Sequence, residues 1–392
     1  MRKTGFGLIV ALGLSVLPAA AGTVTFPPPG DAHPVSYTCD PSISAALCNQ
    51  LNQTLGSEYA DVFTNATANI YITMGNLPAA AVGHNDQFYT TVFYTDYYNA
   101  LKASIHGPAD AEAFASLPVP TGNNSNPINP GYQVSLTSAL DAALGFSGAQ
   151  GPKGICQPGL TCNPSGCTLG ADTAQTCFNG IITLSNALLP NKMSLFDYSD
   201  SDGGSTNGQY DFFTVVQHET DEILGTGSCI KAGTQVLSGI CNNGLWGISA
   251  ADLFRYVGPG ERGFSIDSSG KVTLPSTQAI FSIDGGETAI ANLSSSKSSD
   301  DYGDLATNCQ HVQDSIGCNA WPAGTNRRGM DLTTDGGTEI AMLDAIGYQL
   351  TGHGQEISAA TPDYTPEPSS IGLVSIGFGV SGILRRRRRQ LS

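Results

Sequence analysis

The pattern of hydrophobic and polar residues along the chain predicts strands and helices that alternate. Residues 68–73 alternate as expected for a half-buried strand, and residues 180–185 form a second short apolar run that predicts a strand. Apolar residues spaced three to four apart predict helices over 42–55, 95–105 and 135–144.

The most informative helical pattern covers residues 211–225. Asp211 is the predicted N-cap, and Gly225 and Gly227 predict where the helix stops. The distance between these signals predicts a helix of about three to four turns.

The C-terminal third continues the alternation. Residues 281–288 predict a hairpin centred on an Asp-Gly turn, and Thr338–Ile346 predicts a closing helix that ends at Gly347. The polar, proline-containing residues 351–365 predict a linker. The order of elements therefore predicts a mixed α+β fold, with one ectodomain over 22–350.

The N-terminus carries a targeting pattern. Arg2 and Lys3 precede an apolar run over 6–18 and three alanines at 19–21, which is typical of a cleaved secretory signal peptide. Residues 1–21 are therefore expected to be removed on export. A buried N-terminal helix is the alternative.

The C-terminus carries a second pattern, made of Pro366-Glu367-Pro368, an apolar stretch over 371–384 and five arginines over 385–389. The stretch is short for a membrane span, and the arginines would hold that end in the cytoplasm. Residues 366–392 resemble the PEP-CTERM sorting signal, in which such a tail directs an exosortase-type enzyme to process the protein. The resemblance implies an exported protein of the cell envelope, surface or extracellular space, transiently anchored in the membrane. An ordinary tail anchor is the alternative.

Charge narrows the classes of function. The chain of 392 residues has a net charge of −16, and the part between its two basic ends is more acidic still. Such a surface repels nucleic acid and suits a secreted protein or one that gathers cations. The sequence contains neither the Gly-x-Ser-x-Gly motif of serine hydrolases nor a nucleotide-binding glycine loop.

The ten cysteines are close neighbours in sequence, which predicts up to five loop-stapling disulfides in an oxidising compartment. The local pairs are Cys39 with Cys48, Cys229 with Cys241, and Cys309 with Cys318. The remaining four form one cluster of Cys156, Cys162, Cys167 and Cys177. The connectivity of this cluster stays open, and a zinc site is the alternative there.

Candidate chemistry lies on the 211–225 helix. His218 and Glu222 are four residues apart, so their side chains leave one face of the helix and can bind one metal ion. Glu219 is at the position of the general base in the H-E-x-x-H zinc motif. Glu222 replaces the second histidine of that motif; a carboxylate can bind zinc but holds it less selectively. The alternative is the solvated face of an amphipathic helix.

The succession of segments resembles a metzincin-type metallopeptidase, in particular leishmanolysin-like relatives with a long insertion before the third ligand. The matching segments are Gly180–Ser185, His218-Glu-Thr-Asp-Glu-Ile-Leu-Gly225, Ala251-Asp-Leu-Phe-Arg-Tyr256, Phe281-Ser-Ile-Asp-Gly-Gly286, Asp301-Tyr-Gly-Asp-Leu305 and Leu343-Asp-Ala-Ile-Gly-Tyr348. The resemblance implies a metallopeptidase domain with a twisted mixed sheet, an active-site helix and long disulfide-stapled loops. It also implies that residues 180–185 are the edge strand beside the substrate.

The resemblance further implies a third ligand at the triplet Gly303-Asp304-Leu305. Asp304 is the candidate and His311 the alternative, while an aspartate in this acidic loop is also typical of a turn or a calcium site. Ser228, the position in the short-spaced metzincin pattern, is a poor zinc ligand. Met330 is the candidate for the supporting methionine turn, or an ordinary core residue.

We therefore predict a secreted, surface-sorted peptidase-like protein that hydrolyses peptide bonds through metal-activated water, with Glu219 as base and His218, Glu222 and Asp304 as ligands. Zinc is the predicted metal, and manganese, iron or calcium also suit carboxylates. The expected partners are the exosortase-type enzyme, the membrane and a protein or peptide substrate. The alternative is a non-catalytic envelope or matrix protein that binds a polymer or calcium.

Overall fold

A computed structural model describes much of the chain. The described residues are 34–78, 81–121, 128, 133–147, 153–160, 166–169, 176–199, 209–230, 241, 247–294, 302–306, 312–313, 332–333 and 336–360. The predicted signal peptide, the sorting signal, His311 and Met330 lie outside these residues. Among the described residues, no helix combines the length and the hydrophobicity that crossing a membrane requires.

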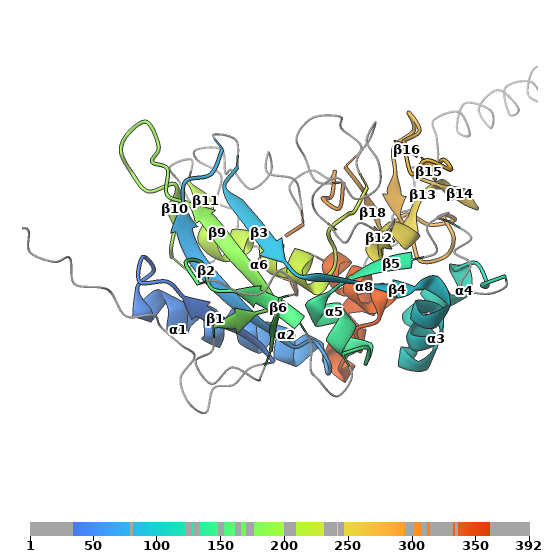
Figure 1. Cartoon of the computed structure of the whole chain (residues 1–392), viewed down its shortest axis with the longest axis horizontal. Coiled ribbons are helices and arrows are strands. Elements are labelled where there is room, and N and C mark those ends of the chain that lie inside the picture. The colour runs from blue at the N-terminus through green and yellow to red at the C-terminus, as the bar shows by residue number, and fades with distance from the viewer. Residues whose placement is uncertain are drawn as a thin grey trace, which may run out of the picture.

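The main sheet has four strands in the order β1-β2-β9-β3 (Figure 1). The strands are β1 (Val35–Cys39), β2 (Ala68–Gly75), β9 (Gly180–Ser185) and β3 (Gly83–Gln87). The first three are parallel, and β3 runs antiparallel to β9. The prediction that residues 180–185 form the edge strand is wrong, because β3 pairs with the outer side of β9 and takes the edge position.

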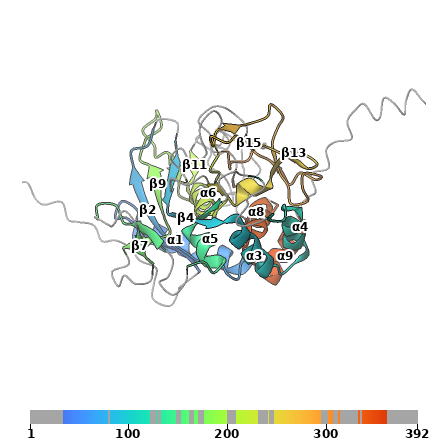
Figure 2. The same cartoon turned by 45° about the vertical axis from the view of Figure 1, so that its right-hand side comes forward.

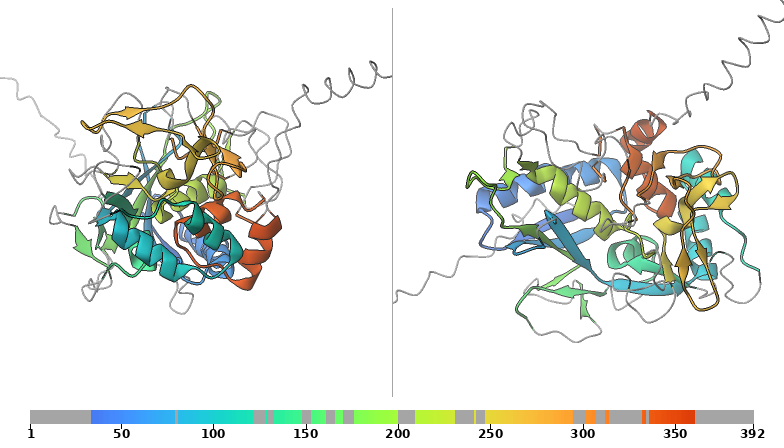
Figure 3. Two further views of the ribbon diagram at one scale, coloured as in Figure 1. Left: turned by 90° about the vertical axis from the view of Figure 1, so that its right-hand side faces the viewer. Right: turned by 90° about the horizontal axis from the view of Figure 1, so that it is seen from above.

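The two faces of the main sheet bury different clusters, as the two-residue period of a strand requires. Ile70 and Ile182 belong to the main hydrophobic core, whereas Tyr71 and Ile181 pack with Phe178 in a separate cluster. Three helices lie on the first face (Figure 3): α1 (Ala45–Gln53), α2 (Leu55–Val62) and α6 (Phe212–Leu224). The opposite face carries a small sheet of β7 (Cys167–Thr168), β6 (Lys153–Cys156) and β8 (Cys177–Phe178).

The other end of the molecule is mainly helical (Figure 2). Its helices are α3 (Tyr94–Ser104), α4 (Pro108–Ser116), α5 (Ser138–Ala143), α8 (Thr338–Ile346) and α9 (Gly352–Ala360). The predicted closing helix is thus confirmed. The predicted linker at 351–365 is helical over α9, where Gly354 lies against the backbone of Val62 on α2.

A three-stranded sheet in the order β12-β5-β4 borders these helices. Its strands are β4 (Tyr89–Phe93), β5 (Gln133–Thr137) and β12 (Gly247–Ser249). The helix predicted over 135–144 is wrong at its start, because Ser135 pairs with strands on both sides. Thr137 then accepts a hydrogen bond of 3.3 Å from the Leu140 N–H and caps the shorter helix α5.

The upper right of Figure 1 is a third region of short strands. The sheet β14-β13-β17-β18 consists of Glu261–Arg262, Arg255–Gly258, Ile280–Phe281 and Ala291–Asn292, and the 3₁₀ helix η2 (Ala251–Phe254) precedes it. A small hairpin pairs β15 (Ser265–Ile266) with β16 (Val272–Thr273). Strands β17 and β18 pair antiparallel, which confirms a hairpin after Phe281, with a longer connection than predicted.

Helix α6 follows a two-stranded ladder of β10 (Phe196–Asp197) and β11 (Tyr210–Asp211). Its predicted ends are confirmed: the side chain of Asp211 accepts a hydrogen bond from the Phe213 N–H, and Gly225 ends the helix with a φ of 129°. Every residue of α6 is buried, including its charged ones. A helix buried on all sides has to give its polar side chains internal partners.

Disulfides staple the loops around this fold. The predicted pairs Cys39–Cys48 and Cys229–Cys241 are confirmed, and the cluster contains the bond Cys167–Cys177. Cys309 and Cys318 lie outside the described residues. The Cys229–Cys241 bond anchors the chain shortly after α6.

Candidate metal centre

Three side chains predicted as ligands converge in space. One ligand atom from each of His218, Glu222 and Asp304 can be chosen so that all three atoms lie within 4.8 Å of one another. His218 Nε2 is 3.9 Å from Glu222 Oε1 and 3.5 Å from Asp304 Oδ1. Two ligands come from α6 and the third from a distant loop, so the arrangement is a product of tertiary folding.

The imidazole of His218 is held from its other side. Its Nδ1 lies 3.0 Å from the carbonyl oxygen of Val312, so that Nδ1–H can donate and Nε2 faces the two acids. Metal-binding histidines usually make this second hydrogen bond, which fixes the ring and its tautomer. The side-chain nitrogen of Gln313 lies 3.4 Å from His218 Nε2, the same ring nitrogen that faces the two acids.

Gln313 ties this segment to the surrounding core. Its backbone N–H donates to Glu339 on α8 at 2.8 Å, and its carbonyl accepts from the Leu305 N–H at 2.8 Å. Its side-chain oxygen accepts a hydrogen bond from Thr226 just beyond α6. A short piece of chain therefore links α6, α8 and the loop of Asp304 at the candidate centre.

The backbone around Asp304 is equally constrained. The Ser294 N–H donates to the Asp304 carbonyl at 2.7 Å, and Leu293 and Leu305 form an antiparallel bridge. Gly303 lies so close to the chain after α6 that a Cβ atom would stand 2.8 Å from the Thr226 carbonyl oxygen. Only a residue without a side chain lets the loop carry Asp304 this near to His218.

The side chain of Glu219, on α6, faces Asn85 and Gly83 of the edge strand β3. The side-chain amide of Asn85 on β3 donates a hydrogen bond of 2.7 Å to Glu219 Oε2 and a second one to Glu222 Oε2. Gly83, two residues earlier, leaves room for the other oxygen, since a Cβ there would be 2.3 Å from Glu219 Oε1. One amide thus holds the candidate base and a candidate ligand together.

The electrostatic field of the cluster is strongly negative. Burial favours the neutral ring of His218, but the charges of Asp304 and Glu222 outweigh it and raise the pKa of His218 to about 10. Burial and the neighbouring Glu222 raise the pKa of Glu219 to about 7. The potential that favours a protonated imidazole also favours a bound metal cation.

Helix α6 carries a third buried carboxylate, Asp221. Tyr59 on α2 donates a hydrogen bond of 2.5 Å to Asp221, whose side chain is fully buried. Burial raises the pKa of Asp221 well above its usual range. The hydrogen bond from Tyr59 ties α6 to α2.

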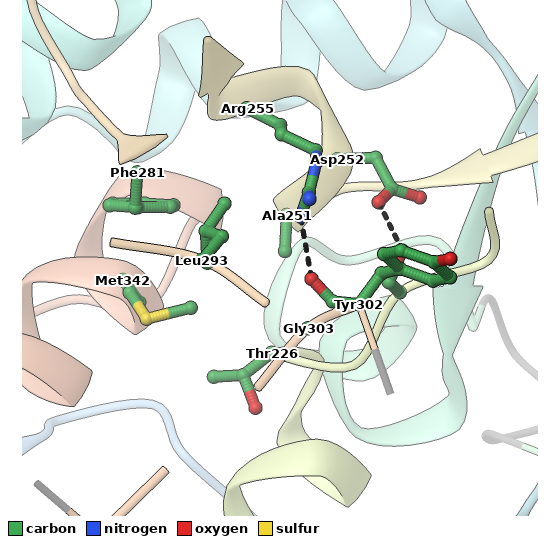
Figure 4. Close-up of a pocket in the computed structure, with 10 residues that line it drawn as sticks. Thr226, Ala251, Asp252, Arg255, Phe281, Leu293, Tyr302, Gly303 and Met342 are labelled. Atoms are coloured by element: carbon green, nitrogen blue, oxygen red, sulfur yellow. Dashed lines mark hydrogen bonds between the residues drawn. The ribbon is translucent and has the colours of Figure 1, made fainter. Parts of the chain in front are cut away.

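A small cavity lies behind the Asp304 loop (Figure 4), with room for about one water molecule. Phe281, Leu293 and Met342 form its apolar part, and Gly303 lines it on the side of the site. It is a packing defect next to the candidate centre and is too small for a substrate.

Asp252 lies at the rim of this cavity. It accepts hydrogen bonds from the Ser228 hydroxyl at 2.6 Å and from the N–H groups of Cys229 and Ser249. These bonds tie η2 to the segment that follows α6. The role of Asp252 is structural, because its three hydrogen-bond donors are groups of the protein itself.

The predicted ligands His218, Glu222 and Asp304 are thus brought together, with Glu219 beside them. His311 and Met330 lie outside the described residues. Sequence reasoning missed Asn85, Gln313 and Gly83. A polar Gly-His-Asn-Asp-Gln strand has no apolar alternation to reveal it, and Gln313 belongs to no motif.

Comparison with known proteins found no match to this chain among family models, curated proteins or solved structures.

Proposed function

We propose that this chain is a metal-dependent peptidase in which His218, Glu222 and Asp304 hold one metal ion and Glu219 acts as general base. The observation that carries the proposal is the convergence of three ligand atoms within 4.8 Å from two distant parts of the chain. The metzincin-like succession of segments described above supports the same assignment, and the α+β fold is compatible with it.

The donor set fits a divalent metal. Four ligands around zinc, at about 2.1 Å from it, lie roughly 3.4 Å apart in a tetrahedron. The distances of 3.5 Å and 3.9 Å from His218 Nε2 to the two acids are close to this spacing. One imidazole and two carboxylates suit zinc and also manganese or iron. Small side-chain adjustments would therefore complete the site without moving the backbone.

A bound metal ion supplies Lewis-acid polarisation of the scissile carbonyl and acidifies water. In a metal-loaded site the Glu219 carboxylate would take a proton from the attacking water and pass it to the leaving amine. A general base must lie within reach of the proton that it takes, and Glu219 lies on α6 next to the proposed ligand His218. Asn85 holds the carboxylate in place through Oε2.

We also propose export to an oxidising compartment, followed by sorting at the cell surface. Three disulfides among the described residues support this, because such bonds persist mainly outside the cytoplasm. The tail that resembles a PEP-CTERM signal is the expected substrate of the exosortase-type enzyme.

The proposal is tested on the purified protein by metal analysis and by hydrolysis of an unstructured protein such as casein. We expect about one equivalent of metal, and Glu219→Gln should retain it while losing hydrolysis by roughly 100- to 10,000-fold. Glu58→Gln is the matched control, because Glu58 also contacts α6, at Gln217, but away from the cluster. A protein without metal, or activity untouched by Glu219→Gln, would refute the peptidase.

Burial supports a second candidate, a non-catalytic protein with a structural metal site. His218, Glu219, Glu222 and Asp304 are only 6–8% exposed, which is typical of a closed site rather than of an open catalytic one. Under this function the protein binds metal, melts at lower temperature after chelation and shows no hydrolysis. The same two measurements therefore separate the two candidates.

A further inference from the structure

We propose that Arg255 is a positioning residue for the metal centre, and that it acts by fixing the loop that carries Asp304. The inference rests on the proposed metal site and adds to it a residue that contacts none of the ligand side chains through a described hydrogen bond. Arg255 begins strand β13, immediately after η2, and its side chain is 1% exposed.

The guanidinium group joins two points of the chain that precede Asp304. Its Nη1 donates a hydrogen bond of 2.6 Å to the Tyr302 carbonyl, and its Nη2 donates one of 2.5 Å to the Ser294 carbonyl. Figure 4 shows the arginine reaching from the η2 side across to Tyr302. The same guanidinium lies 5.6 Å from the centre of the Tyr302 ring.

Both anchored residues lead directly to the third ligand. Tyr302 precedes Asp304 by two positions, with Gly303 between them packed against the chain after α6. Ser294, whose carbonyl binds Arg255, donates its own N–H to the carbonyl of Asp304. Arg255 therefore reaches the Asp304 backbone by two routes, through the hydrogen bonds of Ser294 and along the chain from Tyr302.

The geometry requires arginine. A buried cation needs hydrogen-bond partners, and the planar guanidinium serves two carbonyls at fixed positions through Nη1 and Nη2. A lysine at 255 would present a single ammonium group, which cannot reproduce the fork. Replacement should leave the sheet in place and loosen the loop, so that Asp304 no longer stays near His218.

The test measures zinc affinity of the purified full-length protein by competition with a chromophoric chelator. We expect Arg255→Lys to weaken zinc binding about 10- to 100-fold, the usual range for residues that support a ligand. The absorption spectrum of the cobalt-substituted protein should also change, because it reports the ligand geometry directly. A purely structural role would lower the melting temperature and leave both readouts unchanged.

Arg262→Lys is the matched control. Arg262 lies on the neighbouring strand β14, donates to the Leu253 carbonyl and stacks on Tyr256 at 4.3 Å, but it holds neither Ser294 nor Tyr302. We expect the zinc affinity of the Arg262→Lys protein to stay within about twofold of that of the wild type. Tyr302→Leu is a milder second variant that keeps Arg255 and should weaken zinc binding about two- to fivefold.

A double variant completes the test. In an Asp304→Asn background, Arg255→Lys should cause no further loss of zinc affinity, since the group that it positions no longer binds as a carboxylate. Wild-type affinity in Arg255→Lys, or an equal loss in the two backgrounds, would overturn the role of Arg255 alone. A wild-type protein that binds no zinc, manganese or iron would instead overturn the proposed function and this inference with it.

Discussion

The side-chain amide of Asn85 on β3 lies 2.7 Å from Glu219 Oε2 on α6. The same nitrogen also donates to Glu222 Oε2, so one edge strand controls the orientation of both acids. Two like charges held side by side in a buried site repel each other, and a shared donor offsets part of that repulsion. The position of strand β3 is therefore part of the candidate site as well as of the sheet.

Asn85→Ala should lower the rate of peptide hydrolysis about tenfold, because Glu219 loses the hydrogen bond that orients it. With zinc supplied in excess, the metal content should remain near one equivalent, since all three ligands are intact and the excess offsets the affinity lost with the hydrogen bond to Glu222. Steady-state kinetics with metal analysis on the same sample check this. Asp86→Ala, on the exposed face of the same strand, is the control and should keep wild-type activity. Equal losses in the two variants would assign the effect to the strand as a whole.

Sequence reasoning located α6 and its acids because the necessary information is local. Asp211, Gly225 and the apolar spacing mark the helix ends, and a spacing of four residues places His218 and Glu222 together. Asp304 required a family resemblance, because nothing near it in the chain indicates a partner on α6.

The missed features depend on pairing between distant segments. Strand β3 is polar throughout, and its hydrogen bonds with β9 rather than its side chains make it a strand. Ser135 was assigned to a helix from its local pattern, but strands on both sides of it decide its conformation. Strand order, and with it the identity of the edge, follows from these contacts and not from periodicity.

Gly303→Ala should weaken zinc binding about tenfold or more. The added Cβ would meet the Thr226 carbonyl oxygen at 2.8 Å and the Ser228 nitrogen at 2.9 Å, and because both are backbone atoms the Asp304 loop has to move. Gly227→Ala is the control, since its nearest atoms would be 3.8 Å away. Chelator competition on both variants checks the prediction, and similar affinities would contradict it.

The N-cap of α6 offers a stability prediction. Asp211→Ala should lower the free energy of unfolding by about 0.5–2 kcal/mol, because the Phe213 N–H loses its acceptor. Asp211→Asn should be no less stable than the wild type at pH 7. Burial raises the pKa of Asp211 to about 6, and asparagine caps a helix equally well without placing a charge there. Urea unfolding of the metal-free proteins checks both values, and a larger loss for Asn than for Ala would refute the capping argument.

Asp344 on α8 predicts how stability depends on pH. Its side chain is buried, and burial, followed by the charge of Asp110 on α4, raises its pKa from the usual 3.8 to about 8. Between these two values the folded protein binds a proton that the unfolded chain releases. The stabilisation from this proton is complete below pH 3.8, is lost as the pH rises to about 8, and does not change further above that.

Asp344→Asn should therefore become more stable relative to the wild type as the pH is raised from 5 to 8. The neutral amide fills the same space and has no proton to lose, so the part of the pH dependence that belongs to Asp344 disappears. Free energies of unfolding by urea at several pH values, with the metal removed, measure the difference between the two proteins. All other titrating groups are common to both and cancel.

Asp61→Asn, at an exposed position beside His353, is the control and should not show this trend. A difference between Asp344→Asn and the wild type that stays constant from pH 5 to 8 would show that Asp344 is ionised throughout this range.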